Sequence, residues 1–442
     1  MKRDIYKQLL EWKDDPFRKP LILKGARQTG KTYILKEFGR KEFDHTAYFN
    51  FEEEPDLKSF FKDSLNPRKI LEKLSIYCGK TIKPEKTLIF FDEIQESPKA
   101  LTSLKYFNEL DEKYCVVSAG SLLGIKVGVS APFPTGKVTF LKLYPFSFGE
   151  FLDGLGKEKF RKLLDNISEL KPVDEVFHKE FIKDLKLYFY VGGMPEAIKR
   201  YNADKDLSKV RKIHKDILYG YENDFRKHTG KPESIKLTNT WRVIPVQLAK
   251  ENKKFKYSEV SKYARAREYN EIIIWLEDAG LVYKSYNIEV PKLPLSGYKK
   301  ENIFKLFLLD IGLLGAMLDL SSKTIIEGNS LFSEYNGAYT ENFVAEELIA
   351  CGFSELYYWT SARTAEVDFV LSRDENIYPL EVKAGISRQK KSLKVYGQKY
   401  KNSILSMATV RNFKHDGKIH NYPLYAVSRF PISSFAKYQK TA

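Results

Sequence analysis

The stretch "LILKGARQTGKTYIL", Leu21 to Leu35, decides the fold of the N-terminal region. An apolar run leads into a loop framed by glycines, and a second apolar run follows. The loop fits the pattern G-x-x-x-x-G-K-[ST] at Gly25, Gly30, Lys31 and Thr32. Between a buried strand and a helix, such a loop holds phosphates with backbone N–H groups and the helix N-terminus. The residues expected to bind a nucleotide are Gly25, Ala26, Arg27, Gln28, Thr29, Gly30, Lys31, Thr32 and Tyr33.

A second apolar strand ends in two acidic residues. In "TLIFFDEIQ", Thr87 to Gln95, these are Asp92 and Glu93. Carboxylates at the carboxyl end of a buried parallel strand lie where Mg²⁺ and an attacking water are needed. We expect Lys31 to reach the β- and γ-phosphates and Thr32 and Asp92 to hold Mg²⁺. Glu93 is then expected to polarise the water.

Two further stretches read as strands of the same sheet. "YCVVSAGSLLG", Tyr114 to Gly124, ends in small polar residues, and Ser118 or Ser121 is a candidate for sensing the γ-phosphate. "HTAYFNFEEE", His45 to Glu54, fits the strand between the loop helix and the acidic strand. Strands that alternate with helices in this way predict an α/β fold with a doubly wound parallel sheet.

These motifs resemble those of the AAA-type P-loop ATPases of bacteria and archaea that carry a C-terminal restriction-endonuclease-like domain of unknown role. The resemblance implies ATP as the nucleotide and a helical lid after the sheet. At Lys137 the chain departs from the family, which usually has an arginine there, so no phosphate-sensing arginine or arginine finger is identified. The matching stretches are "GARQTGKT", "FFDEIQ", "SAGSLLG", "LKLYPFSFGEFL" and "YFYVGGMPEAI".

The middle of the chain has the pattern of a winged helix. Within residues 256–288, Ser258 could cap a short helix through Tyr263, and a second helix ends at Gly280 before a strand-like segment. Its apolar face is formed by Ile272, Ile273, Leu276 and Ala279. Its start carries Arg265, Arg267 and Tyr269, which suit a DNA major groove. Because the helix also carries Glu271, Glu277 and Asp278, DNA contact and a pure packing role remain equal alternatives.

The second informative stretch is "YYWTSARTAEVDFVLSRDENIYPLEVKAG", Tyr357 to Gly385. It predicts two strands, 366–371 and 377–383, that pair as a hairpin and bring Asp368, Glu381 and Lys383 together. Two carboxylates and a lysine on adjacent strands suit phosphodiester hydrolysis. Asp368 and Glu381 are the expected ligands of Mg²⁺ or Mn²⁺, and Lys383 would orient the attacking water.

This arrangement resembles the PD-(D/E)XK nuclease superfamily, with Asp368 as the D and residues 381–383 as the E-x-K. The resemblance implies an additional acid, Glu341 or Glu346, on a preceding helix, and a following helix over 392–400. It leaves open whether the site cleaves DNA or only binds it.

Composition bounds the partners and the compartment. The net charge of +16, from 74 Lys and Arg against 58 Asp and Glu, favours nucleic acid or another polyanion as the partner. We expect this partner to be DNA rather than RNA. A lysine-rich proteome is the alternative explanation. The cysteines Cys78, Cys115 and Cys351 fit a reducing cytoplasm. No run of 18 uncharged apolar residues predicts a membrane span.

The prediction is a four-part chain: an AAA-type P-loop ATPase core at 1–155, a helical lid at 156–235, a winged-helix-like segment at 236–325, and an α/β PD-(D/E)XK nuclease-like domain at 326–442. ATP hydrolysis would be coupled to DNA binding, with or without Mg²⁺-dependent cleavage. Two alternatives are an ATP-gated switch whose nuclease-like domain is inactive, and an ATPase that remodels a protein. Homo-oligomer formation is compatible with the resemblance.

Overall fold

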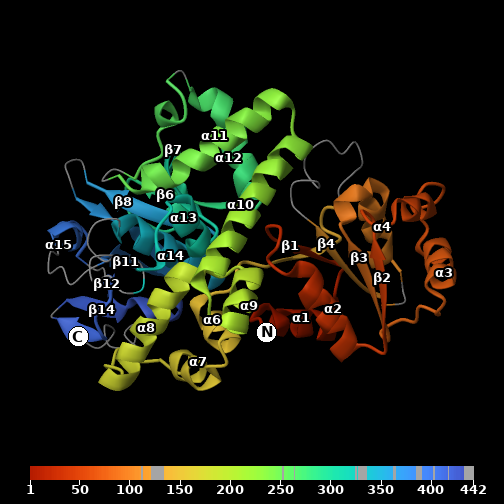
Figure 1. Cartoon of the computed structure of the whole chain (residues 1–442), viewed down its shortest axis with the longest axis horizontal. Coiled ribbons are helices and arrows are strands. Elements are labelled where there is room, and N and C mark those ends of the chain that lie inside the picture. Colours follow the sequence, from red (N-terminus) through yellow and green to blue (C-terminus); the bar gives the residue numbers. More distant parts are fainter. Residues whose placement is uncertain are drawn as a thin grey trace. The chain divides into compact units, whose positions relative to one another are not determined.

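The computed structural model describes residues 1–110, 113–120, 134–250, 253–262, 264–323, 326, 336–361, 365–384, 391–401, 404–416 and 418–432 (Figure 1). Its contacts divide the chain into two compact units. Unit 1 comprises residues 1–144 with 278–280, and unit 2 comprises residues 145–277 with 281–442. The finer division into four parts stays a prediction.

Unit 1 is built on a five-stranded parallel sheet in the order β2-β3-β4-β1-β5. The predicted parallel α/β architecture is therefore confirmed. The strand β1 that precedes the glycine-framed loop lies between β4 and β5, and β4 separates it from the acidic strand β3. The strands are β1 (Leu21–Lys24), β2 (His45–Asn50), β3 (Thr87–Asp92), β4 (Cys115–Gly120) and β5 (Thr139–Lys142).

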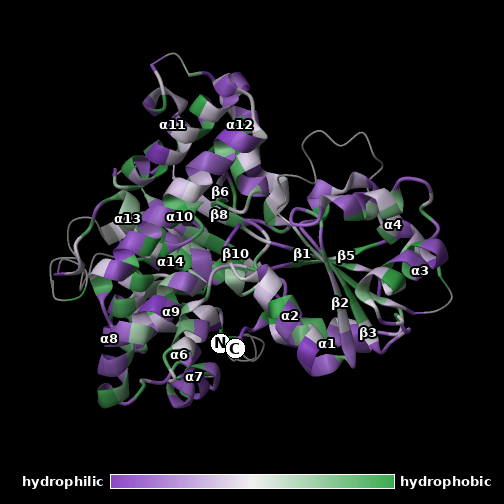
Figure 2. Ribbon diagram, turned by 45° about the vertical axis from the view of Figure 1, so that its right-hand side comes forward, coloured by the Kyte–Doolittle hydropathy of each residue, from purple (hydrophilic) through white to green (hydrophobic). Residues whose placement is uncertain are grey.

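Helices cover both faces of this sheet because both faces of its central strands are apolar. Alternate residues of β3 belong to different cores: Leu88 and Phe90 pack with α1 and α2, whereas Ile89 and Phe91 pack with α3 and α4. Figure 2 shows hydrophobic residues along the strands and mixed hydrophobic and hydrophilic residues on the helices. The helices are α1 (Ile5–Asp14), α2 (Lys31–Glu42), α3 (Pro67–Cys78) and α4 (Pro98–Asn108).

Unit 2 begins with a helical region. A Gly-Gly pair separates α8 from α9. The buried Asp310 holds this turn in place, because its carboxylate accepts hydrogen bonds from the N–H groups of Gly193 (2.5 Å) and Leu313 (2.9 Å). The stretch "YFYVGGMPEAI" is therefore a structural joint. The helices are α6 (Phe148–Gly154), α7 (Glu158–Asp165), α8 (Glu175–Val191), α9 (Pro195–Asp204), α10 (Leu207–His228) and α11 (Lys231–Leu248).

The middle segment forms the predicted second helix and strand but not an independent wing. The helix is α12 (Ala266–Asp278), and the short helix before it is only a 3₁₀ turn at Tyr257–Glu259, with Tyr263 outside the described residues. Strands β6 (Val282–Ile288) and β7 (Lys299–Leu308) pair antiparallel. They also belong to a four-stranded sheet, β7-β6-β8-β9, in which β6 runs parallel to β8. A separate winged-helix segment is therefore not confirmed.

The C-terminal region contains the predicted helices and hairpin, with one correction. The predicted strand 366–371 is interrupted at Asp368, so β9 (Glu366–Val367) pairs with β8 (Leu356–Thr360), whereas β10 (Phe369–Arg373) pairs with β11 (Asn376–Val382). The interruption places the two halves in different sheets. The second sheet has the order β10-β11-β12-β14-β13. Its other strands are β12 (Leu405–Thr409), β13 (Lys414–Asp416) and β14 (Ile419–Pro423).

The remaining helices of unit 2 are α13 (Ile311–Met317), α14 (Asn336–Ala350) and α15 (Lys391–Lys399). The apolar run at 302–320 is divided between β7 and α13. Among the described residues, no helix combines the length and the apolar character that crossing a membrane requires.

Candidate functional sites

The loop after β1 has the backbone geometry that its glycines predict. Gly30 has φ +95° and directly precedes α2, and Gln28 also has a positive φ of +65°. A Cβ atom at Gly25 would collide with the carbonyl oxygen of Leu143. Glycine is therefore required at position 25 by close backbone packing and at position 30 by conformation.

Lys31, the first residue of α2, is buried within this loop. Its Nζ donates hydrogen bonds to the carbonyl oxygens of Gly25 and Ala26, both at 2.9 Å. Burial lowers the pKa of Lys31 to about 8, although the carboxylates of Glu93 and Asp92 act in the opposite direction. A triphosphate bound by the loop would compete with the two carbonyls for this amine.

The acidic pair lies at the carboxyl end of β3. Asp92 is buried; its Oδ2 accepts a hydrogen bond from the Tyr48 hydroxyl (3.0 Å) and its Oδ1 from the Glu93 N–H (3.1 Å). Glu93 has a left-handed φ of +48°, and the Gln95 side chain donates to its carboxylate. Tyr48 and Gln95 thus orient the two carboxylates that the sequence singled out.

The strand order brings the loop and the acidic pair to one edge of the sheet. In the register of β4, Ser118 lies between Ile22 of β1 and Phe91 of β3. Ser118 is buried, and among the described atoms its hydroxyl has no hydrogen-bond partner. Ser121, the other sensor candidate, lies outside the described residues.

Arg3 supports the loop and was missed by the sequence reasoning. Its guanidinium donates to the carbonyl oxygens of Thr29 (3.1 Å) and Tyr144 (2.6 Å) and is buried. Nothing in the local pattern "MKRDIY" marks Arg3, because its partners are distant in the sequence.

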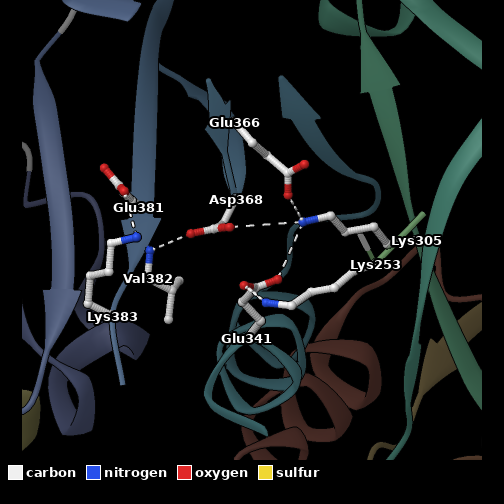
Figure 3. A network of polar contacts seen from close by, with 8 residues as sticks. All are labelled: Lys253, Lys305, Glu341, Glu366, Asp368, Glu381, Val382 and Lys383. Atoms are coloured by element: carbon white, nitrogen blue, oxygen red, sulfur yellow. Dashed lines mark hydrogen bonds and ion pairs between the residues drawn. The ribbon is translucent and has the colours of Figure 1, made fainter. Parts of the chain in front are cut away.

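The second site gathers around Asp368, at the interruption between β9 and β10 (Figure 3). Its Oδ2 accepts a hydrogen bond from the Val382 N–H (2.7 Å). At the end of β11, the Nζ of Lys383 lies 2.8 Å from Oε1 of Glu381. The predicted trio of Asp368, Glu381 and Lys383 is thus brought together. The other carboxylate oxygen of Glu381, Oε2, is buried and has no partner among the described atoms.

Of the two candidates for the additional acid, Glu341 of α14 is the one in this cluster. Its carboxylate contacts the ammonium groups of Lys253 and Lys305, the latter at 3.4 Å. Glu346 instead accepts a hydrogen bond from Asn342 (2.5 Å), and burial raises its pKa well above the usual value.

Lys305 of β7 is the residue at the centre of the cluster, and the sequence reasoning did not find it. Its side chain is completely inaccessible to solvent. Its Nζ lies 2.5 Å from Glu366 Oε1, 3.4 Å from Glu341 Oε2 and 3.9 Å from Asp368 Oδ1. It also lies 4.8 Å from the centroid of the Tyr358 ring.

The electrostatics of the cluster follow from its burial and its lysines. Burial raises the pKa of Asp368 above its usual value, and the charge of Glu341 acts in the same direction. Burial also favours the neutral form of Glu341, but Lys253 and Lys305 outweigh it and lower the pKa of Glu341 below its usual value. Burial opposes the charge on Lys305, whereas Glu341, Glu366 and Asp368 together raise its pKa above the usual value.

The two predicted metal sites differ in their fit to a divalent ion. At the loop, the Thr32 hydroxyl and the Asp92 carboxylate offer the oxygen ligands that Mg²⁺ prefers. At the second site Asp368 is already held by Lys305 and the Val382 N–H, and Glu381 by Lys383. Across the described residues, no group of three or more His, Cys, Asp or Glu side chains could hold a metal ion. As arranged here, the second site does not fit one.

Family models cover three parts of the chain. Residues 17–152 match an AAA domain, whereas residues 182–324 and 336–427 each match a domain of unknown function, DUF8612 and DUF4143. The C-terminal match therefore adds no support for the nuclease-like prediction.

Two relatives that match most of the chain are both described as uncharacterized. The chain is 27% identical over 363 residues to the uncharacterized protein MJ1544 of Methanocaldococcus jannaschii, covering 79% of this chain and 71% of that one. It is 23% identical over 398 residues to an uncharacterized protein of Haemophilus influenzae, covering 86% of each.

Solved structures are only distantly similar. The Walker-type ATPase PABY2304 of Pyrococcus abyssi has a TM-score of 0.44 and 15% identity, covering 72% of this chain and 95% of that one. The ORC1 protein of Aeropyrum pernix, solved in complex with DNA, has a TM-score of 0.29 and 13% identity, with 71% and 91% covered. With the glycine-framed loop, the acidic strand and the parallel sheet, the match over residues 17–152 identifies the N-terminal part as an AAA-type P-loop ATPase domain.

Proposed function

We propose that the protein binds and hydrolyses ATP with Mg²⁺ in unit 1 and couples this cycle to the binding of nucleic acid, DNA rather than RNA. The observation that carries the proposal is the strand order β2-β3-β4-β1-β5, which puts the loop after β1 and the acidic pair after β3 at one edge of the sheet. In parallel sheets, ligands bind at this edge.

The residues would divide the work of hydrolysis as follows. The loop N–H groups and Lys31 would hold the phosphates, and Thr32 and Asp92 would hold Mg²⁺, directly or through water, which would supply charge neutralisation at the phosphates. Glu93 would orient and polarise the attacking water. Its position supports that role, because Glu93 directly follows Asp92 and its carboxylate accepts a hydrogen bond from the Gln95 side chain.

Nucleic acid as the partner rests on the net charge of +16. Binding driven by phosphate contacts weakens steeply as salt is raised, which separates it from binding to a protein partner.

The test is ATP hydrolysis with and without duplex and single-stranded DNA, at low and moderate salt. Lys31→Ala should abolish hydrolysis, whereas Lys41→Ala, an exposed lysine of the same helix, should leave it unchanged. DNA stimulation that disappears in Lys31→Ala would support the coupling. Hydrolysis that responds to no nucleic acid would refute the coupling and favour the alternative that the ATPase remodels a protein.

For the C-terminal region we infer a PD-(D/E)XK-like domain that binds DNA without cleaving it. Its support is the order α14, β8, β9/β10, β11, α15, β12, with Asp368 hydrogen-bonded to the Glu381-Val382-Lys383 segment at the Val382 N–H. Binding is favoured over cleavage because lysines already pair with Asp368 and Glu381.

A plasmid-nicking assay in Mn²⁺ decides whether this domain cleaves DNA or only binds it. We expect none from the wild-type chain. Nicking that Lys383→Ala abolishes and Lys31→Ala retains would show that the domain cleaves DNA.

A further inference from the structure

The second site, the cluster of side chains around Asp368, contains its own cation. Three carboxylates, those of Glu341, Glu366 and Asp368, converge on the Nζ of Lys305 (Figure 3). They come from α14, from β9 and from the interruption after β9, whereas Lys305 comes from β7. Three segments distant in the sequence, β7, α14 and β9 with the interruption after it, therefore meet at one ammonium group.

The position of Lys305 is fixed along its whole length. Its strand pairs with β6 in the register Lys305↔Ser285, and Phe304 and Leu306 on either side are buried. Its Nζ lies against the Tyr358 ring at 4.8 Å, which adds a cation–π contact to the ion pairs. Because the side chain has no accessible surface, Lys305 cannot turn out to solvent while the sheet stays intact.

A divalent ion would need the oxygen atoms that this ammonium already contacts. Mg²⁺ binds oxygen at 2.0–2.1 Å and requires an ordered octahedral shell. An ion on Asp368 and Glu341 would lie beside the buried charge of Lys305 and the partly buried charge of Lys253, with little solvent to screen the repulsion. Lysine and metal therefore exclude each other at this cluster.

We propose that Lys305 is the resident cation of the Asp368 cluster, standing where a divalent metal would otherwise bind. The site is neutralised by the chain itself. It holds β7, α14 and the β9–β10 interruption together without a metal. Removing only the ammonium should leave three convergent carboxylates, a set of hard oxygen ligands that suits Mn²⁺ or Mg²⁺.

The test is a titration of the full chain with Mn²⁺ in the absence of nucleotide. Electron paramagnetic resonance measures the concentration of free Mn²⁺ at each step. Wild type should show no stoichiometric site. Lys305→Met should bind one Mn²⁺ per chain at least tenfold more tightly than wild type, and adding Asp368→Asn should remove that site. The matched control is Lys284→Met, a buried lysine of the neighbouring strand β6 that pairs with Glu277.

Two outcomes would overturn the proposal. One is stoichiometric Mn²⁺ binding by wild type that Asp368→Asn abolishes, a comparison that decides the matter even where Lys305→Met fails to fold. The other is a folded Lys305→Met, shown by circular dichroism, that binds Mn²⁺ no better than wild type. This proposal rests on the nuclease-like inference only for the expectation that a metal would bind at Asp368. The readout is metal binding, so failure of the ATPase or DNA proposal leaves this test unaffected.

Discussion

Replacing Asp310 tests the joint between α8, α9 and α13. In Asp310→Ala the N–H groups of Gly193 and Leu313 lose their acceptor. The lost N-cap of α13 costs about 1 kcal/mol and the unsatisfied N–H of Gly193 about 2 kcal/mol. We therefore expect the free energy of unfolding of unit 2 to fall by about 3 kcal/mol at pH 8.

The same substitution should lower the free energy of unfolding by a larger amount at acidic pH. Burial raises the pKa of Asp310 to about 6 in the folded protein, against a usual value of 3.8. A raised folded pKa gives stability that is complete below the unfolded pKa and is lost as the pH rises through 6. At pH 5 the protonation of Asp310 raises the folding equilibrium constant about tenfold, which is about 1.4 kcal/mol of stability. At pH 8 this contribution has disappeared. Since alanine lacks this contribution, the loss should be about 1.4 kcal/mol larger at pH 5 than at pH 8.

Urea unfolding followed by tryptophan fluorescence measures both quantities. Three of the four tryptophans, Trp241, Trp275 and Trp359, lie in unit 2. The control is Asp174→Ala, which removes an exposed N-cap aspartate of α8 and should cost about 1 kcal/mol. An equal cost of Asp310→Ala at the two pH values, or a larger one at pH 8, would refute the reasoning.

Four more predictions concern the joint and the nucleotide site. Gly192→Ala should destabilise unit 2 by at least about 2 kcal/mol in the same urea assay, because φ is +68° and the new Cβ would collide with the carboxylate that holds the joint. Glu93→Gln should slow ATP hydrolysis at least about 100-fold while leaving the affinity for a fluorescent ATP analogue intact, and equal loss of both would contradict its role at the water. Arg3→Ala should weaken binding of that analogue by about three- to tenfold, because the carbonyl of Thr29 loses its donor. Since the pKa of Lys31 is about 8, ATP binding at pH 9 should take up roughly one proton; calorimetry in buffers of different ionisation enthalpy would contradict this by showing none.

Local sequence pattern was enough to predict the parallel sheet of unit 1. The strands β1 and β3 are short runs of apolar residues, because helices cover both sides of the sheet, and such runs are evident in the sequence. The position of Asp92 and Glu93 at the end of β3 could be predicted because they close one of these runs. Their orienting partners, Tyr48 and Gln95, could not be chosen among many tyrosines and glutamines without the register of the sheet.

Alternation predicted the strands around Asp368 but missed the change of sheet. A period of two shows which residues share a face only while the strand stays regular. The polar and apolar residues keep alternating through the interruption, so the pattern of "EVDFVL" contains no sign of it. The side chains of Glu366 and Asp368 nevertheless both reach Lys305, which contacts them from β7.

Lys305 shows why the chemistry of the second site could not be predicted from the sequence. In "NIFKLFLLD" it stands among buried apolar residues, where a lysine must be either exposed or paired with carboxylates. The chain has 58 acidic residues, and the three that contact Lys305 lie 36 to 63 positions further along it. Motif matching finds carboxylates such as Asp368 and Glu381 readily because they stand in short recognisable stretches of sequence. It does not find a cation delivered from another strand, and that cation decides whether the carboxylates are free to bind a metal.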